Sequence, residues 1–379
     1  MLAIYVHWPF CISKCPYCDF NSRVGDTSSQ EIWRQAYRRE LEHYAGLLSG
    51  RSVSSVFFGG GTPSLMEAQT VDSVIQDVAR LWRIEKNAEI TLEANPSSAE
   101  ASKFADFCKA GVNRLSLGIQ SFDDAALKFL GRVHNAHEAR NALALAEKNF
   151  PRFSFDMIYG YSGQTPELWR QELGEALSMA KGHLSLYQLT IEPHTPFDVR
   201  TKRGETLACS DDDALSMYET TQEMTLSAGY PAYEISNHAQ PGQESRHNLT
   251  YWHYEDYVGI GPGAHGRYRL NQSRHATENL RAPDAWLQKV KEEDTGLKAD
   301  ETLDDSTAMR EALMMGLRLT EGIDLTLWHE KFPTPLPALL SSTKLEKLRK
   351  EGLIAQNEKT LRATPAGLQR LNAVLAYLN

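Results

Sequence analysis

The chain has 379 residues and a formal net charge of −9, with 41% hydrophobic and 23% charged residues. This acidic balance argues against a large phosphate-binding surface, so we expect no nucleic-acid partner. No apolar run reaches the ~18 residues of a membrane-spanning helix, and the first residues lack the basic start and cleavage site of a signal peptide. We therefore expect a cytoplasmic protein with one large domain and one smaller domain.

Short apolar or β-branched runs alternate with amphipathic stretches through the first half of the chain. Helices are predicted over 31–48 and 67–82, where apolar residues recur at three- and four-residue spacing. The predicted strands cover residues 3–9, 52–59, 88–94, 113–119, 152–160 and 183–191. Such alternation is typical of a parallel sheet with helical crossovers, although periodicity does not separate an open sheet from a partial barrel.

Glycine and polar residues that suggest chemistry fall at or just past the C-terminal ends of these strands. They are the loop around the cysteine-containing segment 11–18, which we call the cysteine loop, the turn 59–62, Glu93, Gln120, Asp156, Gln188 and Glu192. In barrels and in open α/β sheets alike, this rim is where active sites assemble. The placement favours a barrel-like arrangement.

The pattern changes after the sixth predicted strand. An Asp-capped helix is predicted at 212–228 and a further strand at 231–236, and the segment 238–275 is rich in glycine and aromatic residues. From about residue 303 the character is helical, and 341–379 predicts a helix, a hairpin and a helix in a winged-helix-like arrangement. We therefore expect a barrel at 1–235, an aromatic and glycine-rich linker and pocket region at 236–300, and a C-terminal domain at 301–379.

Three cysteines lie close together in CISKCPYC, at positions Cys11, Cys15 and Cys18. Thiolates bind iron–sulfur clusters, copper and zinc, and a cubane cluster usually takes four cysteines, one for each iron. Three ligands would leave one iron open, and an open position is typical of a catalytic metal site. A structural zinc site is the weaker alternative because no second pair of closely spaced cysteines follows.

Three successive glycines follow the second predicted strand in FFGGGTPS. Glycine allows positive φ angles and close backbone approach, so successive N–H groups of this turn can cradle a carboxylate or phosphate. A tight turn without a ligand is the alternative.

Glu93, Gln120 and Asp156 are polar residues in or beside strands that are otherwise expected to be buried. A buried carboxylate is costly unless it is paired or bound, so the three together suggest a shared polar ligand. Arg132, in FLGRVH, is a candidate charge partner at the same rim. Structural ion pairing, or an exposed helix end for Arg132, is the alternative.

CISKCPYC resembles the C-x3-C-x2-C motif of the radical S-adenosylmethionine (SAM) superfamily. The segments IYVHWPFC, CPYCDF, FFGGGTPS, TLEANP, GVNRLSLGIQSF and LGRVH resemble its oxygen-independent coproporphyrinogen oxidase-like branch. The likeness runs from residue 4 into the C-terminal region. It implies an α/β fold, a partial (β/α)6 radical SAM barrel, followed by a smaller α+β region.

This resemblance also implies cofactors and the residues that hold them. The three cysteines would bind a [4Fe–4S] cluster, whose open iron SAM would chelate. The methionyl group of SAM would be received by Gly60, Gly61 and Thr62, and its nucleotide would be lined by Glu93, Gln120, Arg132 and Asp156. Tyr5 would lie near the cluster, and Phe20 would shelter the cluster and the adenine.

Phe20 separates two groups within this branch. Coproporphyrinogen dehydrogenases have a further cysteine at this position and an N-terminal extension, whereas this chain begins at its first predicted strand. Both features are similar to the heme chaperone HemW group instead.

The segment RHNLTYW contains H-N-x-x-Y-W, which resembles the heme-associated signature of that group. Imidazole is a common axial ligand of heme iron, and Tyr251 and Trp252 offer flat apolar area for a macrocycle. A histidine among aromatic residues is more often a packing residue, so ligation by His247 is an open hypothesis. The segment GIGPGAHG is shared across the branch, and a glycine-rich turn is enough to explain it.

The resemblance to the chaperone group implies a protein that binds heme, the cluster and SAM, delivers heme to respiratory proteins and lacks coproporphyrinogen oxidase activity. The alternative is an oxygen-independent coproporphyrinogen III dehydrogenase, which rests on the shared cluster and nucleotide motifs alone. A radical enzyme that acts on another substrate is a remoter alternative. Productive cleavage of SAM, a homodimer and peripheral membrane association through partners stay open.

Overall fold

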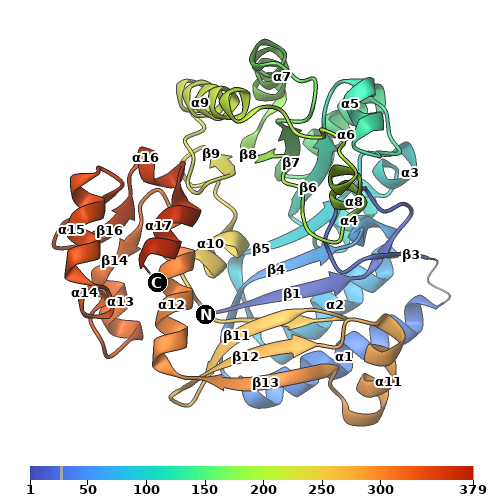
Figure 1. Cartoon of the computed structure of the whole chain (residues 1–379). Helices are drawn as coiled ribbons and strands as arrows, with labels where there is room; N and C mark the ends of the chain where they lie inside the picture. The colour runs from blue at the N-terminus through green and yellow to red at the C-terminus, as the bar shows by residue number, and fades with distance from the viewer. Residues whose placement is uncertain (26–28, 379) are drawn as a thin grey trace.

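The computed structural model describes residues 1–25 and 29–378, and its centre is one mixed sheet of eleven strands (Figure 1). In spatial order the strands are β13 (Leu297–Leu303), β12 (Ser273–Asn279), β11 (His265–Leu270), β10 (Tyr257–Ile260), β1 (Leu2–Trp8), β4 (Ser52–Gly60), β5 (Arg83–Ala94), β6 (Arg114–Gln120), β7 (Arg152–Tyr159), β8 (Gly182–Gln188) and β9 (Asn237–Ala239). Strands β1 and β4 to β8 are parallel and adjacent in chain order. The predicted partial (β/α)6 barrel is therefore confirmed.

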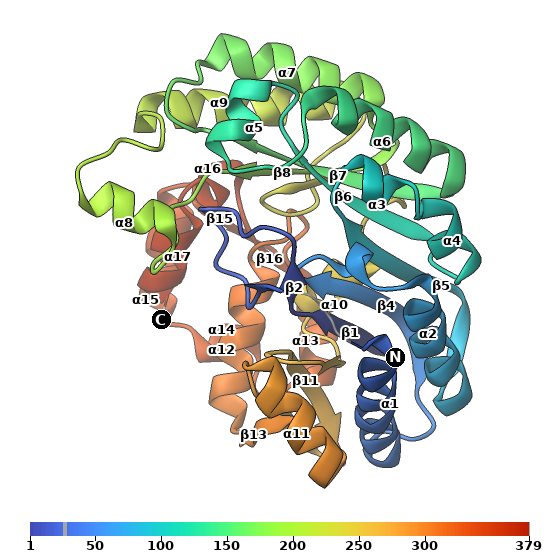
Figure 2. The same cartoon turned by 90° about the vertical axis from the view of Figure 1, so that its right-hand side faces the viewer.

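Helices cover the outer face of this curved wall, where α1, α2, α4, α6 and α7 follow the strands (Figure 2). The helices of this part are α1 (Gln30–Leu47), α2 (Ala68–Leu81), α3 (Ser98–Ala101), α4 (Phe104–Lys109), α5 (Asp124–Phe129), α6 (Ala136–Asn149), α7 (Pro166–Met179), α8 (Pro196–Lys202), α9 (Asp211–Ser227), α10 (Arg246–Trp252) and α11 (Pro283–Glu293), with a 3-10 helix η1 (Pro63–Leu65). Helix α9 begins after Ser210, whose side chain accepts a hydrogen bond from the Asp213 N–H. Its cap is thus a serine, and the aspartates that we expected as the cap lie in the first turn, next to the positive end of the helix dipole.

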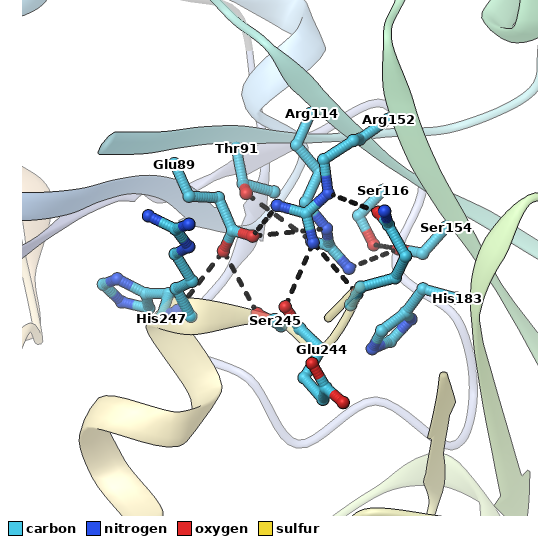
Figure 3. Close-up of polar contacts among 12 residues, drawn as sticks. Glu89, Thr91, Arg114, Ser116, Arg152, Ser154, His183, Glu244, Ser245 and His247 are labelled. Carbon is cyan, nitrogen blue, oxygen red and sulfur yellow. Dashed lines mark hydrogen bonds and ion pairs between the residues drawn. The ribbon is translucent and has the colours of Figure 1, made fainter. Parts of the chain in front are cut away.

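Successive side chains along each strand point alternately to the inner and the outer face of the barrel wall. In β5, Ile90 and Leu92 join the main hydrophobic core, whereas Glu89, Thr91 and Glu93 occupy the opposite face. Strands β6, β7 and β8 repeat this pattern, and their polar side chains point toward one another in Figure 3. The inside of the barrel is therefore polar along these strands, while the outside is sealed by apolar packing.

The segment 236–300, which we expected to be a linker and pocket region, is not a linker but extends the same sheet, and several of its residues line a cavity. Strand β10 pairs in parallel with β1, with Tyr257 opposite Ala3, and β11, β12 and β13 continue the sheet in antiparallel order. The strand predicted at 231–236 is wrong, because the pairing strand here is β9, which begins at Asn237. The buried Glu40 carboxylate of α1 accepts hydrogen bonds from the N–H groups of Gly261 and Gly296, which ties this segment to the first helix.

A second hydrophobic core forms the C-terminal part of the chain (Figure 1). Its elements are α12 (Asp305–Gly316), β14 (Ile323–Asp324), α13 (Leu325–Lys331), α14 (Leu336–Leu339), α15 (Ser342–Lys350), β15 (Ile354–Gln356), β16 (Thr360–Ala363), α16 (Pro365–Leu368) and α17 (Leu371–Leu378). The helix, hairpin and helix expected over 341–379 are present, and β14 completes a small three-stranded sheet. Among the described helices, none has both the length and the apolar character that crossing a bilayer requires.

Candidate functional site

The cysteine loop follows β1 at the C-terminal rim of the barrel and contains two short strands, β2 (Phe10–Cys11) and β3 (Arg23–Val24). Cys11 is buried, and Cys15 and Cys18 are half-buried. The Cys18 N–H donates to the Cys15 carbonyl at 3.1 Å, so the second and third cysteines share one turn. All three side chains line one cavity of about 160 Å³, which we name the cluster cavity. Burial raises the pKa of the Cys18 thiol.

Most residues predicted for the SAM site line this same cluster cavity. They are Phe20, Gly60, Gly61, Thr62, Glu93, Gln120, Arg132 and Asp156. Adjacent parallel strands bring them together because each strand ends at the same rim. Tyr5 differs: it lies on β1, its hydroxyl is 3.1 Å from His7 Nδ1, and it lines a neighbouring cavity instead.

Steric contact shapes the glycine turn after β4. A Cβ at Gly61 would lie 2.6 Å from the Phe10 carbonyl oxygen, and one at Gly60, whose φ is +109°, would lie 2.6 Å from the His7 ring. The N–H groups of Gly61 and Thr62 donate to the carbonyls of Trp8 and Phe10 at 2.6 and 2.8 Å. Our expectation that successive N–H groups of this turn cradle an anion is therefore wrong for these two. The glycines instead let the cysteine loop pack directly on the turn.

Gln120 reaches the cluster cavity through an unusual backbone conformation. Its φ is +70°, which is uncommon for a residue with a side chain. The pairing of β6 with β7 shifts register between Leu117 and Gln120, so the strand bulges at this point. Such local strain is found where the surrounding structure holds a side chain in a functional position.

Two half-buried carboxyl groups, Glu93 and Asp156, line the cluster cavity, and among the described residues neither forms an ion pair. Burial, and then the nearby Asp156, raise the pKa of Glu93 to about 8, against the lowering effect of the Gly60 N–H. Burial raises the pKa of Asp156 to about 6. Glu93 accepts a hydrogen bond from the Gly60 N–H and Asp156 accepts one from Ser185, so a positively charged ligand or one with hydroxyl groups would add an ion-pair partner or further hydrogen bonds.

Arg132 extends from the segment after α5 into the same cavity. Its Nη1 lies 3.2 Å from Cys15 Sγ, and its Nη2 donates to Asn95 Oδ1 at 2.5 Å and to the Gly118 carbonyl at 2.9 Å. Its Nε is buried without a partner among the described residues. Asn95 also donates to Thr62 Oγ1 at 3.2 Å. We gave Asn95 no role from the sequence, although it lies in the TLEANP segment beside Glu93.

The residues of this cavity fit a [4Fe–4S] cluster with SAM. Within the described ranges, no three His, Cys, Asp or Glu side chains converge on a point that could hold a single metal ion. A cubane does not require such convergence, because each thiolate binds a different iron. The cavity offers three thiols and, as far as the described residues extend, an unpartnered Nε of Arg132 and two carboxyl groups without an ion pair. SAM carries a positively charged sulfonium that these carboxyl groups can balance.

A second cavity of about 720 Å³ adjoins the cluster cavity and shares Phe20, Gly60 and Glu93 with it. We name it the aromatic cavity, because its wall includes Tyr5, Tyr251, Trp252, Tyr254 and Tyr257. Helix α12 closes it with Met314 and Met315. Its volume lies within the range of small-molecule sites. Phe20 is 58% exposed, so its ring stands at the junction of the two cavities rather than inside a sealed shell.

Helix α10 carries the three residues that we predicted for heme. Tyr251 and Trp252 line the aromatic cavity, whereas His247 is only 1% exposed. His247 Nδ1 lies 2.9 Å from Ser55 Oγ, its Nε2 lies 2.6 Å from the Tyr251 hydroxyl, and its ring stacks on Phe57. Burial lowers its pKa to about 3. Both ring nitrogens are therefore engaged, and this arrangement does not present His247 to an iron atom.

A buried ionic network that we did not predict anchors α10 inside the barrel (Figure 3). The Glu89 carboxylate accepts hydrogen bonds from the His247 N–H at 3.2 Å and from Ser245 Oγ at 3.4 Å. It pairs with Arg152 at 2.7 Å and with Arg114 at 3.8 Å. Burial opposes its charge, but these two arginines outweigh burial and lower the pKa of Glu89. The polar positions that alternate with apolar ones in AEITLEA, NRLSLGI and HLSLYQL are the signal that could have revealed the network.

Residues 5–173 match the Radical SAM superfamily, and residues 303–370 match the HemN C-terminal domain. A mitochondrial protein of Bos taurus, radical S-adenosyl methionine domain-containing protein 1, is 37% identical over 383 residues, which cover 99% of this chain and 87% of that protein. The chain belongs to the radical SAM superfamily.

Within the radical SAM superfamily, its relatives include proteins named heme chaperone HemW. The one from Escherichia coli (strain K12) is 40% identical over 292 residues, which cover 76% of each chain. The solved structure of the Escherichia coli radical SAM enzyme HemN, a coproporphyrinogen III oxidase, superposes with a TM-score of 0.82 over all of this chain and 90% of that chain, at 23% identity. That likeness shows the fold, and the predicted placement in the HemN-like branch is confirmed.

Proposed function

We propose that this radical SAM protein is a heme chaperone, which binds heme in the aromatic cavity, beside a [4Fe–4S] cluster and SAM in the cluster cavity, and delivers heme to respiratory proteins. The observation that carries the proposal is the aromatic-lined cavity of about 720 Å³ that shares a wall with the cluster cavity. The similarity to proteins named heme chaperone HemW supports it.

In this proposal Cys11, Cys15 and Cys18 hold the cluster, which when bound supplies one open iron for SAM. Glu93 and Asp156 accept hydrogen bonds from the ligand or balance its positive charge, because neither forms an ion pair with any residue that the structure describes. The other residues assigned to the ligand are Gly60, Gly61, Thr62, Gln120 and Arg132, with Phe20 between the two cavities and Tyr5 on the heme side.

The aromatic wall suits a macrocycle. Tyr251 and Tyr257 meet edge to face with ring centroids 4.6 Å apart, so their orientation is fixed by packing. Trp252 packs its ring against the Arg318 guanidinium at 4.6 Å. Rigid aromatic side chains lose little conformational entropy when a flat ligand binds, which favours affinity.

A hemin titration of the anaerobically reconstituted full chain tests the proposal. We expect one equivalent of hemin to give a saturable Soret shift, and the loaded protein to transfer heme to the apo form of a respiratory cytochrome. The same sample should convert no coproporphyrinogen III to protoporphyrinogen IX. Conversion without stoichiometric heme binding would establish the dehydrogenase alternative instead. A triple variant, Cys11→Ser, Cys15→Ser and Cys18→Ser, removes the cluster ligands and so shows how much of the hemin affinity comes from the aromatic cavity alone.

A further inference from the structure

The glycine-rich turn in GIGPGAHG, between β10 and β11, packs closely against β1 and the cysteine loop. A Cβ at Gly261 would lie 2.4 Å from the His7 carbonyl oxygen, and one at Gly263 would lie 2.3 Å from Asn21 Nδ2. The same Asn21 amide donates to the Pro262 carbonyl at 2.9 Å. The turn is thus fixed in position, and its residues Gly263 and His265 line the aromatic cavity.

Two histidines line the aromatic cavity, and they differ in whether their ring nitrogens are engaged. His7 is buried, with Nδ1 3.1 Å from the Tyr5 hydroxyl and Nε2 2.8 Å from the Asn21 carbonyl oxygen. His265 is exposed, and neither of its ring nitrogens has a hydrogen-bond partner in the part of the chain that the structure describes. Heme iron binds an imidazole nitrogen through its lone pair, which only an unengaged nitrogen can offer without breaking a bond.

Arg267 and Arg281, the two arginines that line the aromatic cavity, likewise differ in whether they are paired. Arg267 is held by Glu311, with Nε and Nη2 at 2.9 and 3.0 Å from the carboxylate oxygens. Arg281 also lines the cavity, and its guanidinium forms no ion pair within residues 1–25 and 29–378. An unpaired guanidinium at the exposed edge of an apolar cavity suits a carboxylate such as a heme propionate.

The carbonyl of Arg281 accepts a hydrogen bond from the Asn21 side-chain amide at 3.0 Å. The Asn21 amide, which also donates to the Pro262 carbonyl, therefore holds both the segment before His265 and the backbone of Arg281. Met314 and Met315 add polarizable apolar surface to the cavity. Aromatic and methionine side chains, the His265 imidazole and the Arg281 guanidinium, neither of which is paired within the described residues, therefore share a single cavity.

We propose that the aromatic cavity binds heme through an iron bond to His265 and an ion pair between a propionate and Arg281, and that His247 positions Tyr251 rather than binding the iron. The inference rests on the proposed function, because it names the residues of that same site.

The test is a hemin titration of the full chain, read by the Soret band and by low-temperature EPR, with circular dichroism to verify folding. His265→Ala should lose the histidine-ligated spectrum and bind hemin at least about tenfold more weakly, and added imidazole should restore the spectrum. Arg281→Ala should weaken binding by about tenfold with the ligand spectrum unchanged, and Arg281→Lys should recover part of the loss. His329→Ala, an exposed histidine away from the cavity, is the matched control.

His247→Ala should keep the histidine-ligated spectrum under the same conditions. An unchanged spectrum in folded His265→Ala, together with its loss in folded His247→Ala, would overturn the assignment and leave the heme chaperone proposal standing. Absence of hemin binding by the unmodified chain would overturn the chaperone proposal itself, and the assignment with it.

Discussion

Arg132 Nη1 lies 3.2 Å from Cys15 Sγ inside the cluster cavity. A half-buried positive charge beside a cluster ligand stabilises the reduced, more negative cluster. We therefore expect Arg132→Ala to lower the midpoint potential of the reconstituted cluster by on the order of 50 mV, with a smaller change in Arg132→Lys. A redox titration followed by EPR measures this. Arg80→Ala, which removes a half-exposed surface arginine, is the control, and an equal shift in that variant would contradict the prediction.

The free energy of unfolding of the ligand-free protein should fall with rising pH because of Glu93. Its pKa is raised to about 8 in the folded protein, above the value of about 4.3 in an unfolded chain, so the folded state holds a proton that the unfolded state releases. This contribution is fully present below about pH 4 and is lost as pH rises through 8, by at most about 1.4 kcal/mol per pH unit. Urea denaturation between pH 5 and 9 checks it. Glu93→Gln should lack this part of the slope, and parallel curves would refute the assignment.

Glu89→Ala should destabilise the barrel strongly. The change leaves the guanidinium groups of Arg114 and Arg152 without their carboxylate, and breaking a buried ion pair typically costs about 3–5 kcal/mol. It also removes the acceptor of the His247 N–H, so backbone amides of α10 should exchange faster with deuterium. Glu85→Ala on the same strand removes only an acceptor for Ser52 and should cost much less. Equal losses in the two variants would mean that the network contributes nothing of its own.

Gly61→Ala should prevent the cluster from assembling. The added Cβ would lie 2.6 Å from the Phe10 carbonyl oxygen, so the cysteine loop would have to move away from the turn. Iron and sulfide analysis after anaerobic reconstitution measures the loss. Gly46→Ala is the matched control, because a Cβ there meets nothing within 4 Å and the residue lies in α1. That control should keep its cluster and gain about 0.5–1 kcal/mol of stability. Full cluster content in Gly61→Ala would contradict the steric role.

Much of the barrel and of the cluster cavity could be predicted because the signals are local. The alternation of strands and helices reflects hydrophobic period within each segment, and parallel strands end at one rim. Glu93 and Asp156, which lie in β5 and β7, therefore meet in the cavity as the pattern indicated, and Arg132 joins them from the loop after α5. The three cysteines follow the first predicted strand, so the cysteine loop was also expected at this rim, and it lines the same cavity.

Strands β10 to β13 could not be predicted in the same way. Strand β11 reads HGRYRL and β12 reads SRHATEN, in which charged residues replace the apolar ones that mark a strand core. Their place in the sheet depends on the pairing of β10 with β1, and no local pattern encodes a pairing across that separation. The engaged Nδ1 of His247 likewise could not be predicted, because its partner Ser55 lies on β4, far away in the sequence.

The same pairing has a consequence for synthesis of the protein. Ala3 lies opposite Tyr257 in a chain of 379 residues, so one edge of the first strand stays unpaired until about two thirds of the chain has been made. Such long-range parallel pairing forms slowly, and an open apolar edge invites association with other chains. The Asn21 amide, which follows the three cysteines, also waits for the carbonyls of Pro262 and Arg281. A nascent chain on the ribosome therefore carries a cysteine loop that lacks these hydrogen bonds, and the complete cluster-binding site forms only after most of translation is over.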